Sequence, residues 1–167
     1  MSSLWFLDPI NTLLIWLKKK TRKMKITVIG TNIVTQKGDF FGTGIPYFPL
    51  VVGYTAAYLR EKGHQIQVID AFGENPFQVE EEDDKYIQGL TPGQVRERIE
   101  KKTDLIAIGA ERVVAHGSIV KIIREMQKDP ELRKIPIALL ENTQAVTAYS
   151  LEKVKNEIWK ENVSFIL

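Results

Sequence analysis

The sequence has no cysteine among its 167 residues and only two histidines. Without thiols the chain forms no disulfide, no zinc–thiolate site and no iron–sulfur cluster. The hydrophobic share of 44% is that of a globular protein, and a chain of this length can bury one core. We therefore expect one domain with an N-terminal extension, and no set of metal ligands.

Several motifs that mark nucleotide and hydrolase sites are missing as well. No GxGxxG opens a helix after the first expected strand, and GxxxxGK[ST] does not occur, so the usual phosphate-binding loops are absent. GxSxG and HExxH are also absent. A response regulator would need carboxylates at the ends of its first and third strands, where this chain has Gly30 and Gly109.

The net positive charge is confined to the N-terminus. The net charge is +2, but residues 1–23 hold five basic side chains against Asp8, which places +4 there and leaves −2 on the remainder. Phosphate backbones are bound by basic surfaces. We therefore expect no nucleic-acid partner for the domain.

Residues 1–23 have the pattern of an amphipathic helix with a basic end. Asp8 and Pro9 are typical of a helix start. Apolar side chains then follow one helical face, at Phe6, Ile10, Leu13, Leu14 and Leu17. The segment is too short and too interrupted to span a bilayer, and its charge follows its apolar part, unlike a secretory signal.

Three interpretations of this helix remain open. It docks on an anionic membrane or on a partner protein, it packs on its own domain, or translation begins at Met24. The expected location is the cytoplasm, with the first interpretation adding a peripheral membrane contact.

Residues 24–167 alternate strands and helices. Strands are expected at 26–30, 66–70, 105–109, 137–140 and 163–167, and helices at 49–62, 91–102, 118–128 and 150–160. The pattern predicts an α/β fold, a doubly wound five-stranded parallel sheet of the flavodoxin-like, Rossmann type with strand order 2-1-3-4-5.

Two details of this pattern can be tested against the structure. The first helix should lay Leu50, Tyr54, Ala57, Tyr58 and Leu59 on the sheet. Residues 72–90 contain five consecutive carboxylates at 80–84, which favour a solvated surface loop.

Ligands of such sheets bind at the carboxyl ends of the strands, beside the switch point. That rule selects the long loop 31–48 and the loops after the third and fourth strands. The candidates by position are Thr31, Asn32, Gly109, Ala110, Asn142 and Thr143. His116 is a further candidate at an expected helix start, whereas His64 is expected to be a structural turn residue, and Glu111 with Arg112 a surface pair.

Residues 48–71 carry a family resemblance. They read FPLVVGYTAAYLREKGHQIQVIDA, with Pro49 and Leu50 at the entry, then Tyr54, Ala56, Ala57, Tyr58, Leu59, Gly63, His64, Ile69, Asp70 and Ala71. This segment resembles the N-terminal cobalamin-binding domain of cobalamin-dependent radical S-adenosylmethionine enzymes. The resemblance implies the same flavodoxin-like fold and cobalamin as the cofactor.

The chain departs from that family at three places. The loop after the first strand, GTNIVTQKGDF, lacks the DxHxxG histidine, so the resemblance implies cobalamin without a histidine ligand. Glu141 and Asn142 replace the Gly-Gly after the fourth strand and would crowd the nucleotide groove. The CxxxCxxC of the radical domain is absent from this cysteine-free chain.

The expected function is therefore a cobalamin-binding module, non-catalytic alone, that serves as an accessory or partner domain of a radical S-adenosylmethionine enzyme. The alternative is an interaction or scaffold protein with a degenerate cofactor groove, which docks through its N-terminal helix. A small enzyme that uses loop 31–48 is the third possibility.

Overall fold

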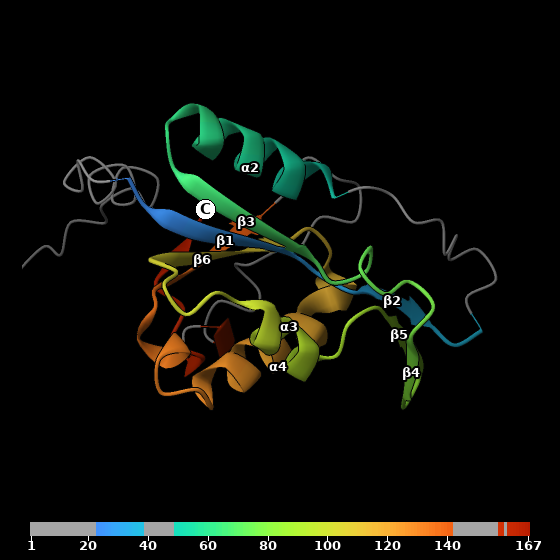
Figure 1. The fold of residues 1–167 in the computed structure, drawn as a ribbon. Coiled ribbons are helices and arrows are strands. Elements are labelled where there is room, and N and C mark those ends of the chain that lie inside the picture. Colours follow the sequence, from blue (N-terminus) through green and yellow to red (C-terminus); the bar gives the residue numbers. More distant parts are fainter. Residues whose placement is uncertain (1–22, 39–48, 142–156, 159) are drawn as a thin grey trace, which may run out of the picture.

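The computed structural model describes residues 23–38, 49–141, 157, 158 and 160–167, and these form an α/β fold built on a five-stranded parallel sheet (Figure 1). Its strands, in spatial order, are β3 (Gln65–Asp70), β1 (Lys25–Gly30), β6 (Leu105–Ala110), β7 (Ile137–Glu141) and β8 (Phe165–Ile166). All four neighbouring pairs run parallel.

A second sheet, not predicted from the sequence, changes the strand numbering. It is antiparallel, with the order β2 (Ile33–Gln36), β5 (Lys85–Gln88) and β4 (Val79–Glu82). Because these strands fall between the others along the chain, the parallel sheet has the order 3-1-6-7-8 when all eight strands are numbered. Counted among themselves along the chain, the five parallel strands have the expected order 2-1-3-4-5.

The acidic segment is therefore a β-hairpin and not the expected surface loop. Its charges are compensated by lysines: Lys37 contacts Glu81, and Lys121 of a neighbouring helix contacts Glu82. Asp83 forms the tight turn with φ of 44°, a conformation that aspartate tolerates better than most residues. Solvation and lysine pairing thus allow strand formation despite the like charges.

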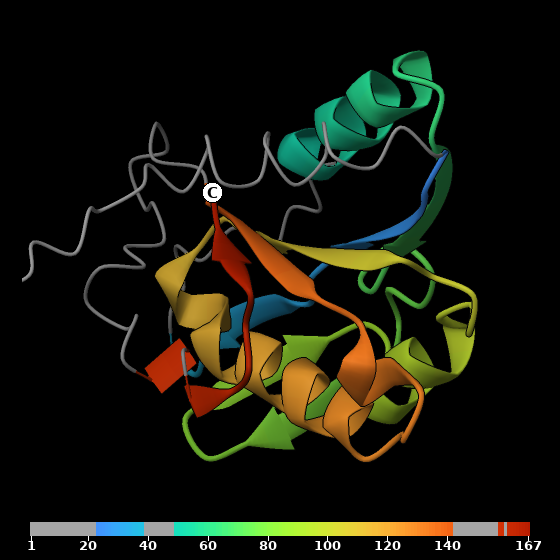
Figure 2. The same ribbon diagram turned by 90° about the vertical axis from the view of Figure 1, so that its left-hand side faces the viewer.

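Helices lie on both faces of the parallel sheet. α2 (Leu50–Glu61) covers one face over β3 and β1, and α3 (Pro92–Arg98) and α4 (His116–Gln127) lie on the other (Figures 1 and 2). Each face has its own apolar cluster, because successive strand residues point to opposite sides. The continuous burial of β6, from Leu105 to Ala110, agrees with a strand covered on both faces.

The side of α2 that contacts the sheet was predicted wrongly. Val52 and Ala56 are buried there, whereas Leu50, Tyr54 and Tyr58 are 59%, 74% and 57% exposed. Of the other two expected residues, Ala57 is exposed and Leu59 packs against the apolar cluster as expected. The helix is apolar on more than one side, so periodicity alone could not choose between them. Small and β-branched side chains contact the sheet, which lets α2 approach closely.

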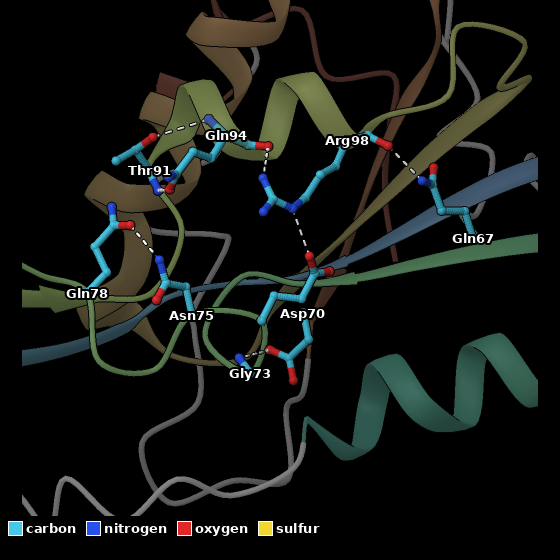
Figure 3. Close-up of polar contacts among 9 residues, drawn as sticks. Gln67, Asp70, Gly73, Asn75, Gln78, Thr91, Gln94 and Arg98 are labelled. Atoms are coloured by element: carbon cyan, nitrogen blue, oxygen red, sulfur yellow. Dashed lines mark hydrogen bonds and ion pairs between the residues drawn. The ribbon is translucent and has the colours of Figure 1, made fainter.

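The local signals at element ends agree better with the structure. Gly63, with φ of 86°, follows α2 as the expected left-handed turn residue. Thr91 caps α3 in a capping box with Gln94, shown in Figure 3. α3 is shorter than expected, because Ile99 turns to an extended conformation and buries its side chain in the core.

The N-terminal helix and most of the helix expected at 150–160 lie outside the described residues. Within the described part, no helix is long and apolar enough to cross a membrane.

Candidate functional site

A small pocket lies at the carboxyl edge of the parallel sheet, with a cavity volume of about 50 Å³. Its walls come from the ends of β1, β3 and β6, from the start of β2, and from the η1 turn (Val113–Ala115) that precedes α4. Its polar lining residues are Thr31, Asn32, Asp70, Glu111 and Arg112. The position agrees with the rule that open α/β sheets bind ligands at this edge.

Asn32 is buried and holds the walls of the pocket together. Its amide nitrogen donates to Leu90 O at 2.9 Å and to Gln88 O at 3.3 Å, and its Oδ1 accepts from Ser118 Oγ at 2.7 Å. One side chain thus joins the end of β1 to β5 and to the first turn of α4. These hydrogen bonds within the protein give Asn32 a positioning role, and its expected contact with a ligand stays a prediction.

Asp70 ends β3 and shapes the next loop. Its Oδ1 accepts a hydrogen bond from Gly73 N at 3.0 Å (Figure 3). A Cβ on Gly73 would lie 2.4 Å from Asp70 Oδ2, so glycine is needed for the observed carboxylate position. The turn fixes Asp70 at the pocket wall.

Glu111 is the most unusual side chain of the pocket. Its Oε1 is buried and has no hydrogen-bond partner among the described residues. Burial raises the pKa of the Glu111 carboxyl above its ordinary value of 4.5, and the negative charge of Asp70 raises this pKa further. The expected surface pair with Arg112 is therefore wrong for Glu111, which lines a pocket.

Arg112 also lines the pocket, and desolvation lowers the pKa of its guanidinium. The cavity thus combines two carboxylates and one guanidinium. Such a group of charges suits a polar ligand that donates hydrogen bonds to Asp70 and Glu111 and accepts them from Arg112. In the described part of the chain, no cluster of three or more histidine, aspartate or glutamate side chains is placed to hold a metal ion.

The other predicted site residues have mixed outcomes. Thr31 and Gly109 line the pocket. A Cβ on Gly109 would lie 3.2 Å from Val52 Cγ2, so this glycine also lets α2 pack closely. Ala110 is fully buried in the core and does not line the pocket. Asn142 and Thr143 lie outside the described residues.

The two histidines lie away from the pocket lining. His116 begins α4, and its Nε2 is 2.9 Å from Glu157 Oε2, a carboxylate of this chain. His64 follows α2, and its Nδ1 accepts from Met24 N at 3.3 Å, which agrees with a structural turn residue.

The sequence reasoning missed Asp70, Glu111 and Arg112 as site residues. The available signal was their position, since Asp70 is the last residue of β3, and Glu111 and Arg112 directly follow β6.

Comparison with protein-family models found no family that matches this chain, and comparison with curated proteins found no matching relative.

Proposed function

We propose that this chain is a cobalamin-binding module that performs no catalysis alone and serves a radical S-adenosylmethionine enzyme as an accessory or partner domain. The support is twofold. The residues with the family resemblance build α2 and β3, and the pocket lies at the edge where this fold binds ligands. A likeness in fold alone would not specify the ligand.

The observation that carries the proposal is the buried Oε1 of Glu111, which has no hydrogen-bond partner among the described residues. A buried acceptor without a donor is costly, and such atoms mark places where a ligand completes the hydrogen bonding. Cobalamin carries several primary amide side chains, each with two N–H donors. The pocket has room for a group of that size, so the described residues fit the cofactor at this point.

The residues that would hold the cofactor are then Glu111 and Asp70, as acceptors for amide N–H groups, and Arg112, as a donor to an amide oxygen. Thr31 adds a hydroxyl to the same wall. Bound cobalamin would supply methyl or electron transfer at cobalt. The chain's own contribution is to bind and orient it, and neither histidine lines the pocket to offer an imidazole ligand.

A titration of the purified chain with hydroxocobalamin, followed by its visible spectrum, tests the proposal. We expect Glu111→Ala to weaken binding by roughly 10- to 100-fold, since hydrogen bonds to charged groups contribute about 1.5–3 kcal/mol. Glu80→Ala is the matched control, because Glu80 is exposed on β4. Equal affinities for both variants would contradict the role of Glu111, and an unchanged spectrum with the unmodified chain would contradict cobalamin binding.

A second function, an interaction protein with a degenerate groove, is favoured by the small volume of the cavity. Its prediction is that no cobalamin binds, while the exposed stripe of Leu50, Tyr54 and Tyr58 on α2 contacts a protein partner. The same titration therefore separates the two functions.

A further inference from the structure

The second sheet ends in an edge strand whose side chains are exposed. β4 pairs with β5 on one side, and in the described part of the chain no strand pairs with its other side. Figure 1 shows β4 as the outermost strand of this sheet. Its first three residues are all exposed. Another chain can add a strand to such an edge unless charge or shape prevents it.

The hydrogen bonds of the hairpin show which residues of β4 face the open edge. Gly89 N donates to Gln78 O at 2.9 Å, so these two residues form a hydrogen-bonded pair of the antiparallel ladder. Hydrogen-bonded and non-hydrogen-bonded pairs alternate along such a ladder. Glu80 therefore bonds to β5, whereas the backbone N–H and C=O groups of Val79 and Glu81 point to the open edge.

Exposed apolar side chains lie beside this edge. Phe77, two residues before β4, is 94% exposed, and Val79 is 51% exposed. Tyr86 of β5 lies diagonally from Val79 on the same face of the sheet and is 40% exposed. The solvent face of an antiparallel sheet is normally polar, and exposed aromatic side chains are frequent anchors of protein interfaces. We name the open edge together with these three side chains the β4 surface.

The charge of the hairpin selects the kind of partner. Residues 79–88 hold five carboxylates and one lysine, and two of the carboxylates contact Lys37 and Lys121, so five negative charges against three positive ones leave −2. In a second copy, β4 against β4 would place carboxylates opposite carboxylates, which is unfavourable. Nucleic acids and anionic membranes carry the same sign of charge as the hairpin. A basic protein segment is the occupant that the charge favours.

We propose that the β4 surface binds an extended basic segment of a partner protein, which adds a fourth strand to the second sheet beside β4. The backbone of the segment pairs with the outward groups of Val79 and Glu81, its basic side chains neutralise the carboxylates, and Phe77 packs on its apolar side chains. A four-residue edge makes a small contact, so we expect a transient complex with a dissociation constant of roughly 10–100 µM. The proposal does not depend on the cofactor, and a failed cobalamin titration would leave it unchanged.

Two labelled synthetic peptides of opposite charge test the preference for a basic segment. Their sequences are Lys-Val-Lys-Val-Lys-Val and Glu-Val-Glu-Val-Glu-Val, which share length and strand propensity. Fluorescence anisotropy with the full chain gives both dissociation constants. We expect the basic peptide to bind at least about 10-fold more tightly than the acidic one. Equal affinities, or no binding of the basic peptide at about 1 mM chain, would overturn the proposal.

Substitutions of exposed residues locate the binding site of the basic peptide. Phe77→Ala and Tyr54→Ala each remove an exposed aromatic side chain, the first beside β4 and the second on α2. We expect Phe77→Ala to weaken binding by roughly 5- to 30-fold, as for interface anchors, and Tyr54→Ala to leave it unchanged. Val79→Pro removes an outward N–H at the first residue of the edge strand, a position that tolerates proline, and should weaken binding roughly 5-fold. Equal affinities of the two alanine variants would overturn the proposal.

Amide hydrogen exchange tests the backbone pairing without any substitution. With the basic peptide at about ten times its dissociation constant, the amide protons of Val79 and Glu81 should exchange about 10-fold more slowly, and that of Glu80, already bonded to β5, should change less. Unchanged exchange at Val79 and Glu81 would overturn the proposal. So would a dimer of the chain alone that sedimentation detects and that Val79→Pro abolishes, because it would assign the edge to a second copy.

Discussion

Replacing Glu111 by glutamine keeps the shape of the side chain and removes its charge. The carboxylate lines the pocket with one buried oxygen that has no partner in the described part of the chain. A buried group left unsatisfied costs about 1–3 kcal/mol, and more when it is charged. Glutamine still leaves a polar atom there but removes the cost of burying the charge, for which we take about 1 kcal/mol because the rest of the side chain is partly exposed. For a domain of this size, that energy raises the melting temperature by about 2–4 °C.

The pH dependence of the increase in melting temperature shows whether the increase comes from removing the charge of Glu111 or from a change in side-chain shape. Burial and Asp70 raise the pKa of Glu111 in the folded chain above the ordinary value of 4.5. The folded state therefore binds the Glu111 proton more tightly than the unfolded state does, and stability falls as the pH rises from 4.5 through the raised pKa. The increase in melting temperature caused by Glu111→Gln should therefore be small below pH 4.5 and reach its full value of about 2–4 °C at pH 8.

Thermal unfolding of both proteins at pH 4 and pH 8, followed by circular dichroism, measures this difference. Glu80→Gln is the control, because its carboxylate is exposed on β4. A Glu111→Gln variant that is less stable than the unmodified protein at pH 8 would refute the reasoning, since it would mean that the Glu111 charge is stabilised in the folded chain.

Four other substitutions have expected effects on the free energy of unfolding, measured by urea denaturation. Val52→Ala should cost about 2 kcal/mol, while Tyr54→Ala should change stability by less than about 0.5 kcal/mol. A larger cost for Tyr54→Ala than for Val52→Ala would mean that α2 contacts the sheet through the side expected from the sequence. Asn32→Ala should cost about 2–4 kcal/mol through the lost hydrogen bonds, and a cost below about 1 kcal/mol would contradict its positioning role. Gly89→Ala should cost at least about 2 kcal/mol, since φ is 121° and a Cβ would lie 2.3 Å from Ala71 O; a neutral result would argue against this turn.

The parallel strands could be predicted from the sequence because burial on both faces gives each a short apolar run. Ile106, Ala107 and Ile108 are the clearest case, as every residue of β6 is buried. The capping box at Thr91 was equally readable, because it depends only on residues three apart. These signals are local, and the structure agrees with them.

The second sheet could not be predicted from local signals. In β4, three consecutive glutamates hide the alternation that marks a strand, and the pairing of Glu81 and Glu82 with Lys37 and Lys121 joins residues far apart in the sequence. The same limit applies to the site. Glu111 beside Arg112 has the pattern of an exposed ion pair, and only the packing of the η1 turn against β2 places both in one pocket.

Equilibrium dialysis against about 100 µM hydroxocobalamin, well above ordinary cofactor dissociation constants, tests the central claim most directly. The measured quantity is cobalt retained per chain for the unmodified protein. Cobalamin binding at the carboxyl edge predicts a ratio near one, and a strongly reduced ratio for Glu111→Ala at concentrations near the dissociation constant. No retained cobalt with the unmodified chain would contradict the claim and favour an interaction protein.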